Sequence, residues 1–116
     1  MNQKPTIDVV IPAFNEQDSI VHILNDMPMD WVREVVVINN NSTDDTVKIA
    51  ASNGATVLDE PRQGYGHACL KGIDYLKNKS KQPDIIVFMD ADYSDHPTEL
   101  PFVVQPIIER NMDMVI

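Results

Sequence analysis

The stretch "EVVVINNNSTDDT", Glu34 to Thr46, joins an uninterrupted run of valine and isoleucine to a run of polar residues. A strand that is apolar at successive positions, rather than at alternate ones, is typical of a parallel sheet covered on both faces. Ser42 then offers a helix N-cap with acidic residues in the first turn behind it, and Gly54 offers a stop. The stretch therefore predicts one strand–loop–helix step of an α/β fold.

Similar steps recur on both sides of this stretch. Further apolar runs predict strands at Ile7–Pro12, Ala55–Leu58 and Asp84–Met89, and the closing "MDMVI" predicts the opening of a fifth strand. Amphipathic segments predict helices at Asn15–Met27, with Asn15 as N-cap, at His67–Lys77 and at Thr98–Glu109. Strand–helix alternation with short connections predicts a mostly parallel sheet with helices on both faces.

The composition indicates one domain of ordinary make-up, with 116 residues, 43% hydrophobic and 23% charged. No apolar run approaches the roughly 20 residues of a membrane-spanning helix, and the N-terminus lacks a signal-peptide pattern, so we expect a cytoplasmic protein. The single cysteine, Cys69, excludes an internal disulfide and agrees with a reducing compartment. With 18 acidic against nine basic residues and a net charge of -9, nucleic acid is not an expected partner.

Polar clusters follow each of the first four predicted strands. In open parallel sheets, ligands bind beyond the carboxyl ends of the strands, which lie at one edge of the sheet. We therefore expect all four clusters to face that edge and to form the ligand site. The clusters are "AFNE" (13–16), "NNNSTDD" (39–45), "DEPRQGYG" (59–66) and "DADYSD" (90–95).

The acidic cluster contains the clearest candidate for a metal site. A turn at Asp90 and Asp92 would bring both carboxylates near a divalent cation, which prefers hard oxygen ligands and keeps positions open for a substrate diphosphate. An EF-hand also begins D-x-D-x-S, but it needs Gly at its sixth place and Glu at its twelfth, where this chain has Asp95 and Pro101. The EF-hand is therefore rejected, whereas a plain turn without a metal stays open.

Two other clusters suit a nucleotide. The amides of Asn39 and Asn40 could read the edge of a base, although a polar loop with a helix cap explains the same residues. Arg62 is the only cation in its loop, and a helix beginning near Gly66 would offer backbone N–H groups to a phosphate. The loop lacks the G-K-[ST] of a P-loop, and "GYG" lacks the third glycine of the dinucleotide fingerprint.

In this order, the four clusters resemble the family 2 glycosyltransferases with the GT-A fold. "VVIPAFNE" looks like the opening strand and nucleotide loop of that family, and "VVVINNNSTDDT" resembles its V-V-D-D-G-S-T-D-G-T segment. "EPRQGYGHACLKGI" is similar to its glycine-bearing helix start, and "VFMDADYSDHPTEL" to its D-x-D metal motif. The resemblance covers nearly the whole chain and is strongest to the polyprenyl-phosphate sugar transferases.

The resemblance implies a Rossmann-like nucleotide-binding half that holds a UDP- or GDP-sugar donor with Mg²⁺ or Mn²⁺. It implies metal-dependent, inverting transfer to an acceptor such as a polyprenyl phosphate or a saccharide, and association with the inner face of the membrane through that acceptor. When the roles of the family's residues are transferred to the matching positions of this sequence, Asn40 contacts the base, Arg62 lies near the diphosphate, and Asp92 ligates the metal. The implied nucleotide-binding residues are Pro12, Ala13, Asn15, Glu16, Asn40, Arg62, Gly66 and Asp90, and the implied metal ligands are Asp90 and Asp92.

Two features depart from the family pattern. Asn39 and Asn40 stand where the family often has two aspartates, and an amide donates hydrogen bonds as well as accepting them. We expect UDP rather than GDP, because the Asn40 amide can pair with the adjacent donor and acceptor of uracil. The acidic catalytic base of the family belongs to a later segment, so it is expected beyond Ile116.

Residues 1–116 are accordingly expected to be the donor-binding part of a transferase, truncated in the fifth strand. By itself this part should be inactive, and it should self-associate through the unpaired edge of the sheet. The alternative is a non-catalytic nucleotide-binding module, or a remnant completed by another chain, which only an activity assay would distinguish. A phosphoacceptor receiver domain fits less well, because it needs an acidic pair after the first strand, where "PAFNE" has one acid.

Overall fold

The computed structural model describes residues 5–93, 96–101 and 114–115 of the chain. The strands are β1 (Ile7–Ala13), β2 (Glu34–Asn39), β3 (Thr56–Asp59), β4 (Ile85–Phe88) and β5 (Met114–Val115). The helices are α1 (Gln17–Asp26), α2 (Thr46–Ser52), α3 (Tyr65–Lys77) and a 3₁₀ turn, η1 (Pro97–Glu99). Strand and helix alternate as predicted, so the α/β class is confirmed.

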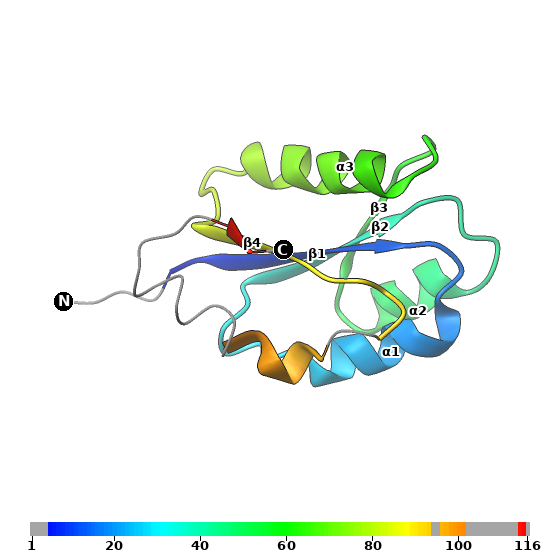
Figure 1. Cartoon of the computed structure of the whole chain (residues 1–116), viewed down its shortest axis with the longest axis horizontal. Coiled ribbons are helices and arrows are strands. Elements are labelled where there is room, and N and C mark those ends of the chain that lie inside the picture. The colour runs from blue at the N-terminus through cyan, green and yellow to red at the C-terminus, as the bar shows by residue number, and fades with distance from the viewer. Residues whose placement is uncertain (1–4, 94–95, 102–113, 116) are drawn as a thin grey trace.

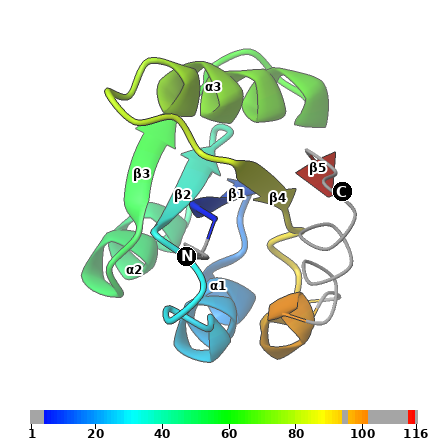
Figure 2. The same cartoon turned by 90° about the vertical axis from the view of Figure 1, so that its left-hand side faces the viewer.

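The strands form one sheet in the order β3-β2-β1-β4-β5, and every neighbouring pair is parallel. Helices α1 and α2 cover one face and α3 covers the other, as Figures 1 and 2 show from two directions. The chain moves outward from β1 to β3 on one side and then returns to place β4 on the other side of β1. This reversal makes the β1–β4 junction the switch point of the sheet, where the connecting loops diverge and a ligand crevice is expected.

The two faces of the sheet have separate cores because successive residues of a strand point to opposite faces. On one face, Val9 and Ile11 pack in the same cluster as Ile20 and Ile23 of α1. On the other, Val10 lies in a cluster with Leu76 of α3. The unbroken apolar runs of β1 and β2 are thus explained by burial on both sides.

A buried ion pair lies near the amino end of β1, away from the polar loops. The Asp8 side chain is fully buried, and its carboxylate accepts hydrogen bonds from Nε of Arg33 at 3.1 Å and from a terminal guanidinium nitrogen at 2.5 Å. The other terminal nitrogen of Arg33 donates to the carbonyl of Lys81 at 2.9 Å. These bonds compensate a carboxylate that would otherwise be costly to bury.

Helix starts differ from the predicted caps. The residue before α1 is Glu16 rather than Asn15, and the residue before α2 is Asp45 rather than Ser42, so both capping predictions are wrong. The stop at Gly54 agrees with its positive φ of 91°. Of the predicted helix at 98–109, positions 102–109 lie outside the described residues.

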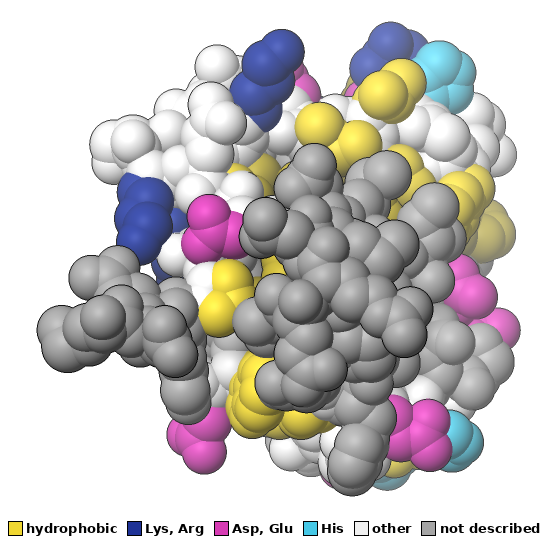
Figure 3. Space-filling model, turned by 60° about the vertical axis from the view of Figure 1, so that its left-hand side comes forward, with side chains coloured by type: hydrophobic (Ala, Val, Ile, Leu, Met, Phe, Trp, Pro, Cys, Tyr) yellow, Lys and Arg dark blue, Asp and Glu magenta, His cyan; other side chains and the backbone are white. Residues whose placement is uncertain are grey.

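The surface charges are spread out. On the face in Figure 3, Lys and Arg side chains lie apart from one another, and acidic side chains lie at several places around the grey atoms. Within the described residues, no helix has both the length and the apolar character that crossing a bilayer requires.

Candidate functional site

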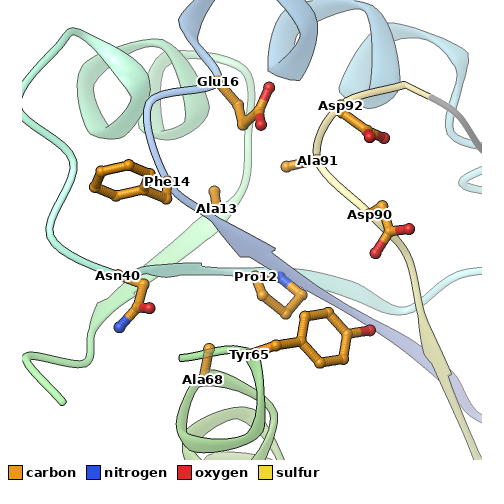
Figure 4. A pocket seen from close by; sticks show the side chains of 10 residues that line it. All are labelled: Pro12, Ala13, Phe14, Glu16, Asn40, Tyr65, Ala68, Asp90, Ala91 and Asp92. Atoms are coloured by element: carbon orange, nitrogen blue, oxygen red, sulfur yellow. The ribbon is translucent and has the colours of Figure 1, made fainter. Parts of the chain in front are cut away.

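A pocket of about 300 Å³ opens at the switch point of the sheet. It lies between the loops that follow β1 and β4, with the end of β2 and the first turn of α3 as its remaining walls (Figure 4). Six of the residues assigned to a nucleotide or a metal from the sequence come together here. The lining residues are Pro12, Ala13, Phe14, Glu16, Asn40, Tyr65, Ala68, Asp90, Ala91 and Asp92.

The acidic wall of the pocket is anchored by the residue between the two aspartates. Ala91 is buried, and its carbonyl accepts a hydrogen bond from the Ser19 hydroxyl of α1 at 2.6 Å. Asp90 and Asp92 on either side of it are exposed, and Figure 4 shows both carboxylates projecting on the same side of the loop. The turn that was predicted to bring the two acids together is therefore present.

Glu16 adds a third carboxylate to this side of the pocket. The single hydrogen of the Ser19 hydroxyl is shared between the Ala91 carbonyl and a Glu16 carboxylate oxygen that lies 3.0 Å from the hydroxyl oxygen, and Figure 4 shows the Glu16 carboxylate on the side of the pocket toward Asp92. The backbone N–H of Glu16 donates to the hydroxyl of the buried Thr46 at 2.9 Å. Ser19 thus connects the loop after β1 with the loop after β4.

The donor set at this wall fits a divalent cation that a ligand helps to bind. Within residues 5–93, 96–101 and 114–115, no group of three or more His, Cys, Asp or Glu side chains is placed to hold a metal ion. Mg²⁺, however, is commonly held by one or two carboxylates together with substrate phosphates and water. Asp90 and Asp92 supply two such carboxylates at the mouth of a pocket, so the residues present suit a cation whose other ligands come from an anionic substrate.

Asn40 is buried, and its side chain is used by the protein itself. Its Nδ2 donates to the carbonyls of Glu60 at 2.7 Å and Arg62 at 2.8 Å, and its Oδ1 accepts from the N–H of Gly64 at 3.0 Å. Both amide hydrogens are therefore occupied. Pairing with both a donor and an acceptor of a base, as the sequence suggested, disagrees with these bonds, whereas contact through Oδ1 stays a prediction.

Arg62 lies outside the pocket lining. Its guanidinium donates to both carboxylate oxygens of Glu60, at 3.1 and 2.9 Å, and its side chain is 62% exposed. These hydrogen bonds, and one from the backbone N–H of Arg62, lower the pKa of the Glu60 carboxyl to about 2. The cation predicted for a diphosphate is thus engaged with a buried carboxylate two residues away.

Asn15 and Gly66 also lie outside the lining. Asn15 adopts a positive φ of 51°, its Oδ1 accepts from the N–H of Thr43 at 2.7 Å, and its own N–H donates to the Ser42 hydroxyl at 2.9 Å. It therefore connects the loops after β1 and β2. Gly66 belongs to the first turn of α3, one residue beyond Tyr65.

The sequence interpretation missed two aromatic lining residues. Phe14 of the loop after β1 is 53% exposed, and Tyr65 at the start of α3 is 52% exposed. Figure 4 places them on different sides of the pocket, with the Tyr65 ring extending toward the side of Asp90. An aromatic residue between two glycines at the ligand edge of a sheet is the signal that could have identified Tyr65.

Comparison with known proteins places these features in a family. Residues 8–116 match the model of glycosyl transferase family 2. An uncharacterized glycosyltransferase of Mycobacterium tuberculosis is 36% identical over 109 residues, covering 94% of this chain and 46% of that protein. Protein RfbJ of Shigella flexneri is 31% identical over 111 residues, covering 95% of this chain and 82% of that protein.

A solved structure is similar in fold as well as in sequence. Glucosyl-3-phosphoglycerate synthase from Mycobacterium tuberculosis, in complex with Mn²⁺, UDP and glucosyl-3-phosphoglycerate, gives a TM-score of 0.76 at 33% identity. The match covers 89% of this chain and 39% of that one. The chain therefore spans less than half the length of this synthase and about half that of the mycobacterial relative.

Proposed function

The chain belongs to glycosyl transferase family 2, and we propose that its edge pocket binds the nucleotide-diphosphate sugar donor of a transfer reaction. Residues 1–116 are then the donor-binding part of a GT-A glycosyltransferase domain. The observation that carries the proposal is the pocket itself. Six residues assigned from the sequence, drawn from the carboxyl ends of β1, β2 and β4 and the loops that follow them, line one cavity at the switch point of a parallel sheet.

The two ends of the pocket differ in chemistry, as the two ends of a nucleotide do. Phe14 lies on the side away from the two aspartates and offers apolar surface on which a base could stack, a contact worth about 1–3 kcal/mol where it has been measured, and the rings of Pro12 and Tyr65 continue this surface toward Asp90. Asp90 and Asp92 lie at the other side, where an anionic diphosphate would be repelled unless a cation lies between. This combination supports a nucleoside diphosphate in preference to an uncharged sugar or a bare phosphate.

Mg²⁺ or Mn²⁺ would be held by Asp92 and Asp90 together with the diphosphate. When bound, such a cation offsets the negative charge that develops on a diphosphate leaving group. The protein's own part is to hold the loop that carries the two carboxylates, and the hydrogen bond from Ser19 to the Ala91 carbonyl supports that part. Glucosyl-3-phosphoglycerate synthase has been crystallised with Mn²⁺ or Mg²⁺ and UDP, which supports the same metal class here.

We propose UDP rather than GDP as the nucleotide. The support is the UDP bound by the structural relative and the modest cavity of about 300 Å³, because uracil is smaller than guanine. The acceptor remains a prediction from the resemblance: a polyprenyl phosphate or a saccharide, with a small phosphorylated acid as the third class suggested by the phosphoglycerate of that relative. Self-association through the sheet edge also remains a prediction.

Isothermal titration calorimetry with UDP and GDP, each in Mn²⁺ and in EDTA, tests the proposal. We expect UDP to bind more tightly than GDP, and Mn²⁺ to strengthen both. Tighter GDP binding would reverse the choice of nucleotide, and no binding of either would contradict the donor site. Because residues 1–116 are expected to be inactive by themselves, acceptor-dependent release of UDP from UDP-glucose by this chain would contradict that expectation and would exclude a non-catalytic nucleotide-binding module.

A further inference from the structure

Three consecutive asparagines at the end of β2 bind the connection between β3 and α3. Asn39 donates from Nδ2 to a carboxylate oxygen of Asp59 at 2.9 Å, and Asn41 donates from Nδ2 to the carbonyl of Pro61 at 3.0 Å. Asn40 lies between them, and its side-chain amide makes three hydrogen bonds to this connection, two donated and one accepted. The end of β3 and the connection at 60–64 are therefore held to β2 by side-chain amides, in addition to the backbone hydrogen bond from the N–H of Glu60 to the carbonyl of Asn39 at 2.9 Å.

Asn40 is the centre of this arrangement because its bonds alternate along the loop. It donates to the carbonyls of Glu60 and Arg62, and it accepts from the N–H of Gly64. Only a primary amide can donate twice and accept once from this position, since a carboxylate has no hydrogen to donate and a hydroxyl has one. Without these bonds, the loop would leave backbone groups without partners beside a buried side chain, which is unfavourable.

Gly64 connects the loop that Asn40 binds with the first turn of α3, which lines the pocket. Its φ of 119° is a conformation that side-chain-bearing residues rarely adopt, and it immediately precedes α3. Its carbonyl accepts the N–H of Ala68 at 3.2 Å, which begins the hydrogen bonding of the helix. Tyr65 and Ala68, the two residues of α3 that line the pocket, are therefore positioned by a turn that Asn40 holds.

We propose that Asn40 is a positioning residue for nucleotide binding: its amide fixes the loop at 60–64 and so sets where Tyr65 and the first turn of α3 meet the ligand. The inference rests on the proposed donor site and deepens it. It assigns Asn40 a role through the loop instead of a direct reading of the base, because both of its amide hydrogens are donated within the protein.

Cys69 provides a probe of this loop that does not depend on any ligand. It is the only cysteine of the chain, it is half-buried on α3 one turn beyond Tyr65, and Tyr65 hydrogen-bonds to it. Its rate of reaction with a thiol reagent should rise when the first turn of α3 loosens. The experiment compares wild type, Asn40→Asp and the control Asn53→Asp, whose amide donates to the carbonyl of Ile49 on an exposed helix end.

In Mn²⁺, we expect Asn40→Asp to weaken UDP binding by about tenfold or more, and to speed the Cys69 reaction in ligand-free protein by a similar factor. Asn53→Asp should change neither by more than about twofold. Lowering the pH from 7 toward 5 should restore part of the UDP affinity of Asn40→Asp relative to wild type. The introduced carboxyl regains one donor when it is protonated, and a role limited to overall stability would not give this profile.

Each other outcome overturns the proposal. Weaker UDP binding with an unchanged Cys69 rate means that Asn40 contacts the nucleotide directly, and no change in either means that it positions nothing. If Asn40→Asp does not fold, Gly64→Ala loosens the same turn from its other side, and unchanged Cys69 reactivity there contradicts the inference. If wild type binds no nucleotide, the proposed function fails, while the Cys69 rates still decide whether Asn40 holds the loop.

Discussion

Helix α3 crosses β1 at Gly72, where a Cβ atom on the glycine would lie 2.6 Å from Cγ1 of Val10. Both residues are buried. Glycine inside a helix is less favourable than alanine by about 1 kcal/mol, so close packing is the physical reason for a glycine here. Figure 1 shows α3 lying along the sheet, and the close approach at Gly72 holds it there. The first turn of α3 supplies Tyr65 and Ala68 to the pocket lining.

We predict that Gly72→Ala lowers the free energy of unfolding by about 1–3 kcal/mol, because overpacking outweighs the gain in helix propensity. Urea denaturation measures it. Gly66→Ala is the matched control, since a Cβ there meets no atom within 4 Å, and it should be neutral or slightly stabilising. In a Val10→Ala background the cost of Gly72→Ala should shrink, and an equal cost in both backgrounds would contradict the steric explanation.

The pair of Asp8 and Arg33 gives a second prediction. Arg33→Met should lower the free energy of unfolding by about 3–5 kcal/mol, because it leaves a fully buried carboxylate without its bidentate partner. Replacing both residues, as Asp8→Leu with Arg33→Met, should cost much less, because no buried charge then remains. Denaturant titration of the three proteins tests this, and a loss of under about 1 kcal/mol in the single variant would show that the ion pair is not needed.

Glu60 gives a prediction about pH. Hydrogen bonds from the side chain and backbone of Arg62 outweigh the burial of this carboxyl and lower its pKa from 4.5 to about 2. A carboxyl whose pKa is lowered by folding stabilises the protein above its ordinary pKa and loses that contribution as the pH falls through the lowered value. The stability difference between wild type and Glu60→Gln should therefore be constant above about pH 4.5 and shrink between there and about pH 2.

Comparing the two proteins isolates Glu60 from other acids with lowered pKa values. Burial alone would raise the pKa of Glu34, but hydrogen bonds from Thr56, Lys79 and Tyr75 lower it, and it is common to both proteins. Urea denaturation from pH 7 to pH 2 measures the difference. A gap that stays constant over the whole range would mean that the ion pair with Arg62 is not formed in solution.

The fold could be predicted because its determinants are local. The unbroken apolar runs of β1 and β2 follow from burial on two faces, and the carboxyl ends of parallel strands must meet at one edge. For the same reason, Asp90, Asp92 and Glu16 could be expected at one site from their positions after strands.

The helix caps were predicted wrongly, and the internal hydrogen bonds of the site loops were not predicted, because both depend on residues that are distant in the sequence. Ser42 and Asn15 are good helix caps by composition, yet Ser42 accepts from the N–H of Asn15, 27 residues away. Arg62 and Asn40 were assigned to a ligand because they are polar residues at a ligand edge. Both side chains also hydrogen-bond to residues of the loop that contains the buried Glu60, which the sequence pattern alone does not indicate, and their contact with a ligand stays a prediction.

Asp92 gives the prediction closest to the proposed function. Its carboxylate lines the pocket beside Asp90, and Glu16 lies on the same wall, so a diphosphate meets three negative charges unless a cation is bound (Figure 4). Asp92→Asn removes one of the two proposed ligands and one of the three charges.

We expect the gain in UDP affinity that Mn²⁺ provides to fall by about tenfold or more in Asp92→Asn, as outer-shell or ligand losses typically produce at metal sites. In EDTA, UDP affinity should stay the same or rise slightly, because repulsion is reduced. Asp45→Asn is the control: it removes an exposed carboxylate at the same edge of the sheet but outside the lining, whose side chain makes no cap hydrogen bond to α2, and it should keep the full effect of Mn²⁺. The thermal midpoint of ligand-free Asp92→Asn should stay near that of wild type, since exposed substitutions usually change stability by under about 0.5 kcal/mol. Calorimetry in Mn²⁺ and in EDTA decides the matter: a wild type with equal UDP affinity in both, or a variant with undiminished Mn²⁺ dependence, would remove Asp92 from the metal site.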